Sequence, residues 1–351
     1  MTWITKPKVD WAGQQRNPLG LTIRDYEGVM STLCAGCGHD SVTAALVQAF
    51  WEMAIRPEQV IKLSGIGCSS KTPAYFLGGA HGFNSVHGRM PSIATGALAA
   101  HRDLIAVGIS GDGDSLSIGM GQFAHAVRRN INVLYLIENN GVYGLTKGQF
   151  SASADCGSKS KRGVESRQQA IDPVATAITL GGSFAARSFS GDKKQLVPLI
   201  KAGLSHPGCA VIDVISPCVT FNDHEGSTKS YAFTRAHHEA VTEADLVEPA
   251  EAIETEYDWG DAVNVTVHDG STIRFKKLEP DYDWSSRAGA LQYLEHHRER
   301  GEVVTGLLYR DADQPDFHTI AKTAKQPLRD MEYEQLCPGS DALTSLQDRL
   351  R

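Results

Sequence analysis

The feature of this sequence that most constrains its fold is a repeated unit of apolar strand, glycine turn and helix. Residues 60–67 (VIKLSGIG) and 103–114 (DLIAVGISGDGD) are apolar runs that end in glycines, and residues 131–140 (INVLYLIENN) form a third run. Two flanking segments, 41–53 and 117–129, carry apolar side chains at helical spacing. This alternation is typical of a doubly wound, mostly parallel α/β sheet with helices on both faces. We expect the functional groups at the carboxyl ends of the strands.

The remaining sequence suggests three parts. Residues 1–30 are polar with little periodicity and predict an N-terminal arm that lies over the surface. The alternation of helices and strands continues to about residue 218, so residues 31–240 are predicted to form one domain. Beyond it the composition becomes acidic, and residues 241–351 are predicted to form a C-terminal extension. This extension is expected to contain a hairpin around Asp269-Gly270, a helix over 288–301 and a strand over 303–311.

Composition excludes several classes of protein. The chain has 351 residues, of which 41% are hydrophobic and 21% charged, with a net charge of −7. It has no apolar run long enough to span a membrane, and its mild acidity argues against a nucleic-acid-binding protein. The first twenty residues lack the apolar centre of a secretory signal, so we expect a cytoplasmic protein. An odd number of cysteines, seven, then favours metal binding or catalysis over disulfides.

Two short motifs at predicted strand ends can together hold a metal ion. Gly111-Asp112-Gly113 ends one apolar run, and Asn140 ends the next, in an Asn-Asn pair. Gly113 lets the chain turn from strand to helix and brings backbone N–H groups against a diphosphate. The Asp112 carboxylate and the Asn140 amide supply the hard oxygen ligands that Mg²⁺ prefers. Both motifs also form ordinary turns. Their placement after apolar strands favours the metal site.

The cysteines form a second candidate site. Cys34 and Cys37 belong to a C-x-x-C loop that opens a helix, whereas Cys68 and Cys218 each follow a strand. Four thiolates at one edge of the sheet suit either zinc or an iron–sulfur cluster. The alternatives are a redox-active C-x-x-C pair, and buried cysteines that act as small apolar side chains. Cys209, in an apolar run, is expected in the core.

The paired Gly-Asp-Gly and Asn-Asn motifs resemble the signature of thiamine diphosphate enzymes. The resemblance implies that Mg²⁺ is bound by Asp112, Asn140 and the backbone carbonyl of Val142. It also implies a set of residues around thiamine diphosphate, in which Gly113 and Asp114 meet the diphosphate. The set is Ile66, Gly67, Cys68, Ser69, His87, Gly113, Asp114, Gly144 and Leu145.

Several longer motifs, in the same order along the chain, resemble the β subunit of 2-oxoacid:ferredoxin oxidoreductases, in particular the 2-oxoglutarate type. They are LCAGCGH from Leu33, GIGCSSK from Gly65, HGR from His87, GDGD from Gly111 and ENNGVYGLTKGQ from Glu138. The resemblance covers residues 30–235 and implies a 4Fe-4S cluster on Cys34, Cys37, Cys68 and Cys218. It also implies an α subunit, usually in an α2β2 assembly, and ferredoxin as the electron acceptor. The N-terminal arm and the long C-terminal segment depart from the family pattern.

The reaction that this resemblance implies is oxidative decarboxylation of 2-oxoglutarate with coenzyme A. Its products are succinyl-CoA and CO₂, with electrons passed through the cluster to ferredoxin, and the reverse carboxylation is chemically open. One alternative is the same chemistry on pyruvate or another 2-oxoacid. Others are a non-redox thiamine diphosphate enzyme with a structural zinc, and a subunit that binds the cofactor while catalysis resides elsewhere.

Three residues are candidates for catalytic contacts. Lys147 can pair with the far carboxylate of a dicarboxylic substrate, although it can equally be a solvated surface lysine. Thr146 is expected to position substrate or phosphate, and His87 to contact the diphosphate or the reacting centre. The glutamate that activates the thiamine ring is expected on the α subunit. Glu138 is expected to belong to the end of its strand.

Overall fold

The described residues fold around a nine-stranded sheet. The computed structural model describes residues 13–158, 164–220, 253–267 and 272–351. The strands follow the spatial order β2-β1-β3-β4-β8-β7-β11-β10-β9. Their bounds are β1 Val60–Ser64, β2 His81–Asn84, β3 Ile105–Gly111, β4 Val133–Asn139, β7 Phe184–Phe189, β8 Ala210–Ile215, β9 Ala262–Thr266, β10 Thr272–Lys277 and β11 Glu302–Arg310.

In the spatial order from β2 through β1, β3, β4 and β8 to β7, every pair of neighbouring strands is parallel. This confirms the predicted fold class. β11 lies antiparallel to β7, and β10 lies parallel to β11. β9 and β10 form the predicted hairpin, whose turn, 268–271, lies outside the described residues. The strands of the predicted extension therefore continue the central sheet.

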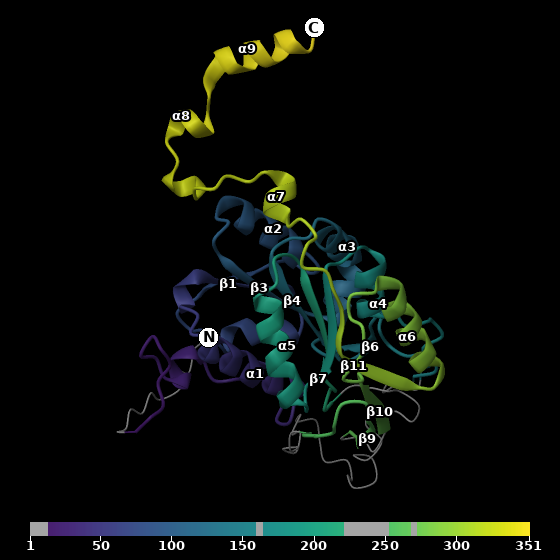
Figure 1. Cartoon of the computed structure of the whole chain (residues 1–351). Coiled ribbons are helices and arrows are strands. Elements are labelled where there is room, and N and C mark those ends of the chain that lie inside the picture. The colour runs from purple at the N-terminus through teal and green to yellow at the C-terminus, as the bar shows by residue number, and fades with distance from the viewer. Residues whose placement is uncertain (1–12, 159–163, 221–252, 268–271) are drawn as a thin grey trace.

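Helices cover both faces of the sheet, as predicted (Figure 1). One face carries α1 and α5, and the other carries α2, α3, α4 and α6. The bounds are α1 Gly38–Glu52, α2 Met90–Ala100, α3 Met120–Arg128, α4 Pro173–Thr179, α5 Lys193–Leu204 and α6 Arg287–Glu299. Shorter elements lie in the connections: η1 Ile23–Tyr26, η2 Pro57–Gln59, η3 Ser69–Ala74, η4 Gly113–Ile118, β5 Val142–Tyr143 and β6 Gln149–Phe150.

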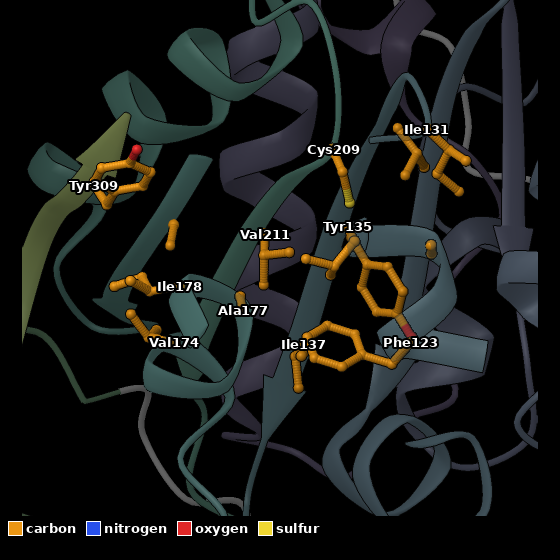
Figure 2. Packing of buried hydrophobic residues seen from close by; sticks show 14 of the residues in the cluster. Phe123, Ile131, Tyr135, Ile137, Val174, Ala177, Ile178, Cys209, Val211 and Tyr309 are labelled. Atoms are coloured by element: carbon orange, nitrogen blue, oxygen red, sulfur yellow. The ribbon is translucent and has the colours of Figure 1, made fainter. Parts of the chain in front are cut away.

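The core lies in two layers because side chains alternate along each buried strand. On β4, Tyr135 and Ile137 face one layer, whereas Leu134 and Leu136 face the other. Figure 2 shows the first layer, in which the rings of Tyr135 and Phe123 pack edge to face with centroids 5.4 Å apart. Each large side chain buried in this way contributes about 1.5–3 kcal/mol. The predicted core position of Cys209 is confirmed, since it is fully buried in the same layer.

The described part of the N-terminal arm packs against α1. Tyr26 is fully buried, and the indole nitrogen of Trp51 donates to the carbonyl of Leu21 (3.1 Å). The Asn17 side chain returns a hydrogen bond to the carbonyl of Trp51 (3.1 Å). These residues therefore belong to the helical layer as well as to the surface.

The C-terminal segment leaves the sheet beside the amino end of β4. It contains α7 Phe317–Ala321, η6 Leu328–Asp330, α8 Tyr333–Leu336 and α9 Gly339–Arg349, and it extends away from the sheet (Figure 1). All residues from 332 onward are exposed. Within the described ranges, the search for a helix of membrane-spanning length and hydropathy found none.

Candidate active site

A cleft lies where β1, β3 and β4 end and the chain turns into η3, η4 and the β5–β6 hairpin. Parallel strands bring their carboxyl ends to one edge, so these three loops meet there. The residues that line it are His39, Ile66, Gly67, Cys68, Ser69, His87, Gly111, Asp112, Gly113, Asp114, Glu138, Asn140, Val142, Tyr143, Gly144, Leu145 and Thr146.

The cleft brings together every residue predicted from sequence for thiamine diphosphate and for Mg²⁺. Of the predicted catalytic residues, His87 and Thr146 also line it. Lys147 is exposed and lies outside this lining. Thr146 donates to the side chain of Gln149 (2.6 Å) within the hairpin.

The oxygen atoms of Asp112 and Asn140 form the metal-binding part of the cleft. Asp112 is almost fully buried, and its Oδ2 accepts hydrogen bonds from the hydroxyls of Ser151 and Ser153. Its Oδ1 accepts a longer bond, 3.3 Å, from the backbone N–H of Asn140. The amide oxygen of Asn140 accepts from the N–H of Val142 (3.1 Å). One carboxylate and one amide oxygen on neighbouring strand ends fit the hard donor set of Mg²⁺.

The carboxylate of Asp114 joins three loops. Its Oδ1 contacts Nδ1 of His87 (2.5 Å) and accepts from the N–H groups of Gly88 (2.7 Å) and Ile66 (3.2 Å). Its Oδ2 accepts from the hydroxyl of Ser110 (2.5 Å). This carboxylate therefore organises the cleft wall, and a contact from Asp114 to a diphosphate would come from its backbone.

Two glycines leave room that a side chain would fill. A Cβ at Gly113 would lie 2.6 Å from the ring of Tyr143, whose hydroxyl donates to the Gly113 carbonyl (3.1 Å). Gly67 has φ +135°, a conformation that side chains disfavour. The backbone at both positions can therefore approach a ligand closely.

The four predicted cluster cysteines lie around the same end of the sheet. Burial raises the pKa of the Cys37 thiol well above its ordinary value, and the nearby Cys218 thiol adds to this rise. Burial also raises the pKa of Cys68, on which the Cys34 thiol acts in the same direction. None of the four described cysteines is in a disulfide, and Cys68 lies beside Gly144 in the cleft. In the described ranges, no three His, Cys, Asp or Glu side chains converge as ligands of a single metal ion.

Two buried ionisable groups in the cleft were missed as site residues by sequence reasoning. Glu138 is fully buried near the end of β4, and burial raises its pKa well above the ordinary value. Its two carboxyl oxygens accept from the hydroxyl of Thr72 (3.1 Å each). Burial lowers the pKa of His39 to about 4, and its Nδ1 lies 3.6 Å from a carboxyl oxygen of Glu138. Glu138 lies on β4 and His39 on α1, and no sequence pattern indicates that these two side chains come into contact.

Comparison with known proteins identifies the domain that carries this cleft. Residues 65–214 match the family model of the thiamine pyrophosphate enzyme, C-terminal TPP binding domain. The chain is 36% identical over 274 residues to the 2-oxoacid:ferredoxin oxidoreductase subunit beta of Sulfolobus sp. The aligned region spans 75% of this chain and 88% of the relative. The chain belongs to the 2-oxoacid:ferredoxin oxidoreductase β-subunit family. It is therefore a thiamine diphosphate-binding subunit of an oxidoreductase.

Other similar proteins are named for 2-oxoglutarate. The 2-oxoglutarate oxidoreductase subunit KorB of Mycobacterium tuberculosis is 39% identical over 191 residues, which are 54% of this chain and 51% of that one. The fold matches a solved structure, the 2-oxoglutarate:ferredoxin oxidoreductase from Magnetococcus marinus with 2-oxoglutarate, coenzyme A and succinyl-CoA bound. The TM-score is 0.69 at 28% identity, and the match covers 86% of this chain and 89% of that chain.

Proposed function

We propose that this chain is the β subunit of a 2-oxoglutarate:ferredoxin oxidoreductase, acting with an α subunit, coenzyme A and ferredoxin. The products are succinyl-CoA, CO₂ and reduced ferredoxin, and the reverse carboxylation uses the same site. The observation that carries the proposal is that Cys68 lines the same cleft as Asp112 and Asn140. On this proposal, a thiol ligand for iron and the oxygen ligands for Mg²⁺ share one site.

For the thiamine site, Asp112, Asn140 and the carbonyl of Val142 would hold Mg²⁺. The backbone at Gly113 and Asp114 would meet the diphosphate. Thiamine diphosphate, when bound, supplies the carbanion chemistry that 2-oxoacid decarboxylation requires. Asp114 fixes the loops of Ile66 and His87 around it, through the hydrogen bonds described above. His87 is thereby held at the cleft as a candidate contact to the cofactor.

For electron transfer, Cys34, Cys37, Cys68 and Cys218 would hold a 4Fe-4S cluster, which supplies a one-electron acceptor when bound. A structural zinc needs four ligands that converge on one ion, whereas each cysteine of a 4Fe-4S cluster binds a different iron. Buried thiolates also need nearby positive charge, which iron supplies.

The rim of the cleft supports the α subunit as a partner. Ile66 and Leu145, in the lining, are 38% and 52% exposed, and Val86, beside His87, is 72% exposed. Apolar side chains gathered around a polar site are typical of an interface. A partner seated there would exclude water from the reaction, and an α2β2 assembly is the arrangement we propose.

Replacing Lys147 with Ala tests the choice of substrate. We expect kcat/KM for 2-oxoglutarate to fall by about 10-fold to 100-fold, the value of one hydrogen bond to a charged group, with a smaller loss for pyruvate. Lys147 is exposed on the hairpin, so folding should be unaffected. The matched control is Lys325→Ala, in the C-terminal segment. Equal losses for both substrates would remove Lys147 from substrate recognition.

The proposed reaction is tested by co-expression with the α chain and anaerobic purification. Iron, sulfide and thiamine are counted per αβ unit, and reduction of ferredoxin is followed with coenzyme A and a series of 2-oxoacids. We expect about four iron and four sulfide from this subunit's cluster and the highest kcat/KM with 2-oxoglutarate. Zinc in place of iron would favour the non-redox alternative, and a preference for pyruvate would favour the other substrate class.

A further inference from the structure

The Asp112 carboxylate is held from the side opposite Asn140 by two serine hydroxyls. Ser151 Oγ and Ser153 Oγ both donate to Oδ2 of Asp112, the latter at 2.7 Å. The two hydroxyls also contact each other at 3.1 Å. Oδ1 accepts the longer bond from Asn140 N. The serines therefore hold Oδ2 of Asp112. Its Oδ1 is left facing Asn140, the other predicted metal ligand.

The hairpin that carries Val142 also delivers these serines. β5 and β6 pair Val142 with Phe150, so the chain returns to its starting point, and the N–H of Ser151 donates to the carbonyl of Gly141 (3.0 Å). The next residue is fixed as well, because the N–H of Ala152 donates a hydrogen bond to Ser117 Oγ (3.0 Å). The serines are thus held on rigid backbone.

A chain of buried polar groups orients Ser153 in turn. Its hydroxyl contacts the amide oxygen of Asn139 (2.9 Å), and Nδ2 of Asn139 donates to Asp213 (3.0 Å). Asp213 accepts from Nε of Arg187 (2.8 Å), and Nη2 of the same guanidinium donates to Asp172 (2.6 Å). Buried hydrogen-bonded networks of this kind rigidify the groups that they connect.

We propose that Ser151 and Ser153 are positioning residues for the Mg²⁺ ligand Asp112, with Ser153 oriented by Asn139 and the Asp213–Arg187 pair. The inference rests on the proposed function of this cleft. Groups that hydrogen-bond a metal ligand fix its orientation, and their loss weakens metal binding even when the ligand itself is intact. The serines act through Asp112.

The test measures Mg²⁺ affinity in the αβ complex after thiamine diphosphate and Mg²⁺ have been removed by chelation. Calorimetry gives the Mg²⁺ concentration at which thiamine diphosphate binding is half-maximal. We expect Ser153→Ala to raise this concentration by about 10-fold to 100-fold, and Ser151→Ala to raise it in the same range. The matched control is Ser158→Ala, a buried serine near the same loop whose hydroxyl has no hydrogen-bond partner among the described residues. It should leave the concentration unchanged.

The outcomes separate this inference from the proposed function. If the wild-type complex binds thiamine diphosphate without Mg²⁺ dependence, the metal site itself is wrong. If the wild type depends on Mg²⁺ but both serine variants behave as Ser158→Ala does, the serines have no positioning role. Should Ser153→Ala fail to assemble, Ser151→Ala, which contacts the same carboxylate oxygen, decides the question.

Discussion

The Asp112→Asn variant is expected to lose about 4 kcal/mol of transition-state stabilisation, or roughly a thousandfold in kcat/KM. The substitution keeps the size of the side chain but removes the negative charge that faces Mg²⁺. It also places an amide in a position where two serine hydroxyls now donate to a carboxylate oxygen. Turnover of 2-oxoglutarate by the αβ complex gives the effect on activity, and calorimetry gives the accompanying loss of thiamine diphosphate binding.

The control for this variant is Asp103→Asn. Asp103 is exposed and precedes β3, whereas Asp112 follows the same strand at its carboxyl end. The two variants change charge equally, so a different effect comes from the place and burial of each carboxylate. Full turnover by the Asp112→Asn complex would mean that this subunit binds the cofactor without contributing to catalysis.

The Cys37→Ser variant is expected to lose the 4Fe-4S cluster and, with it, ferredoxin reduction. The broad absorbance at about 400 nm that marks such a cluster should disappear, together with its bleaching by dithionite. Cys37 is buried at the start of α1 and does not line the thiamine cleft. Thiamine diphosphate binding should therefore persist, which separates loss of the cluster from loss of the cofactor site.

Cys337→Ser is the matched control, since Cys337 is exposed and lies in the C-terminal segment far along the chain from the cluster ligands. It should retain iron and absorbance at the wild-type level. Iron retained in Cys37→Ser would remove this residue from the ligand set. A colourless wild-type complex that contains zinc would overturn the cluster itself.

Local sequence patterns were sufficient for most of the fold. The apolar runs at residues 60–67, 103–114 and 131–140 became β1, β3 and β4, each within a few residues of its predicted bounds. The strand predicted over 303–311 became β11. Strands with an uninterrupted apolar pattern are recognisable because both their faces are buried. β7 was not predicted as a separate strand, since its run FAARSF contains an arginine.

That arginine illustrates what local patterns miss. Arg187 is buried in the strand because Asp172 and Asp213 pair with it, and neither partner is adjacent in sequence. A buried charge is tolerated only with such partners. Sequence reasoning therefore had no basis for identifying the partners that allow Arg187 to lie buried in β7.

The cofactor motifs could be recognised from the sequence because glycine turns, oxygen ligands and thiols follow the predicted strands. At these positions the backbone geometry and the ligand chemistry restrict the choice of residue. The meeting of Glu138 with His39, and of Ser151 and Ser153 with Asp112, depended on tertiary structure alone. Serine, histidine and glutamate serve many roles, and their contacts here join segments far apart in the sequence. Only the packing of loops at a shared sheet edge could select those partners.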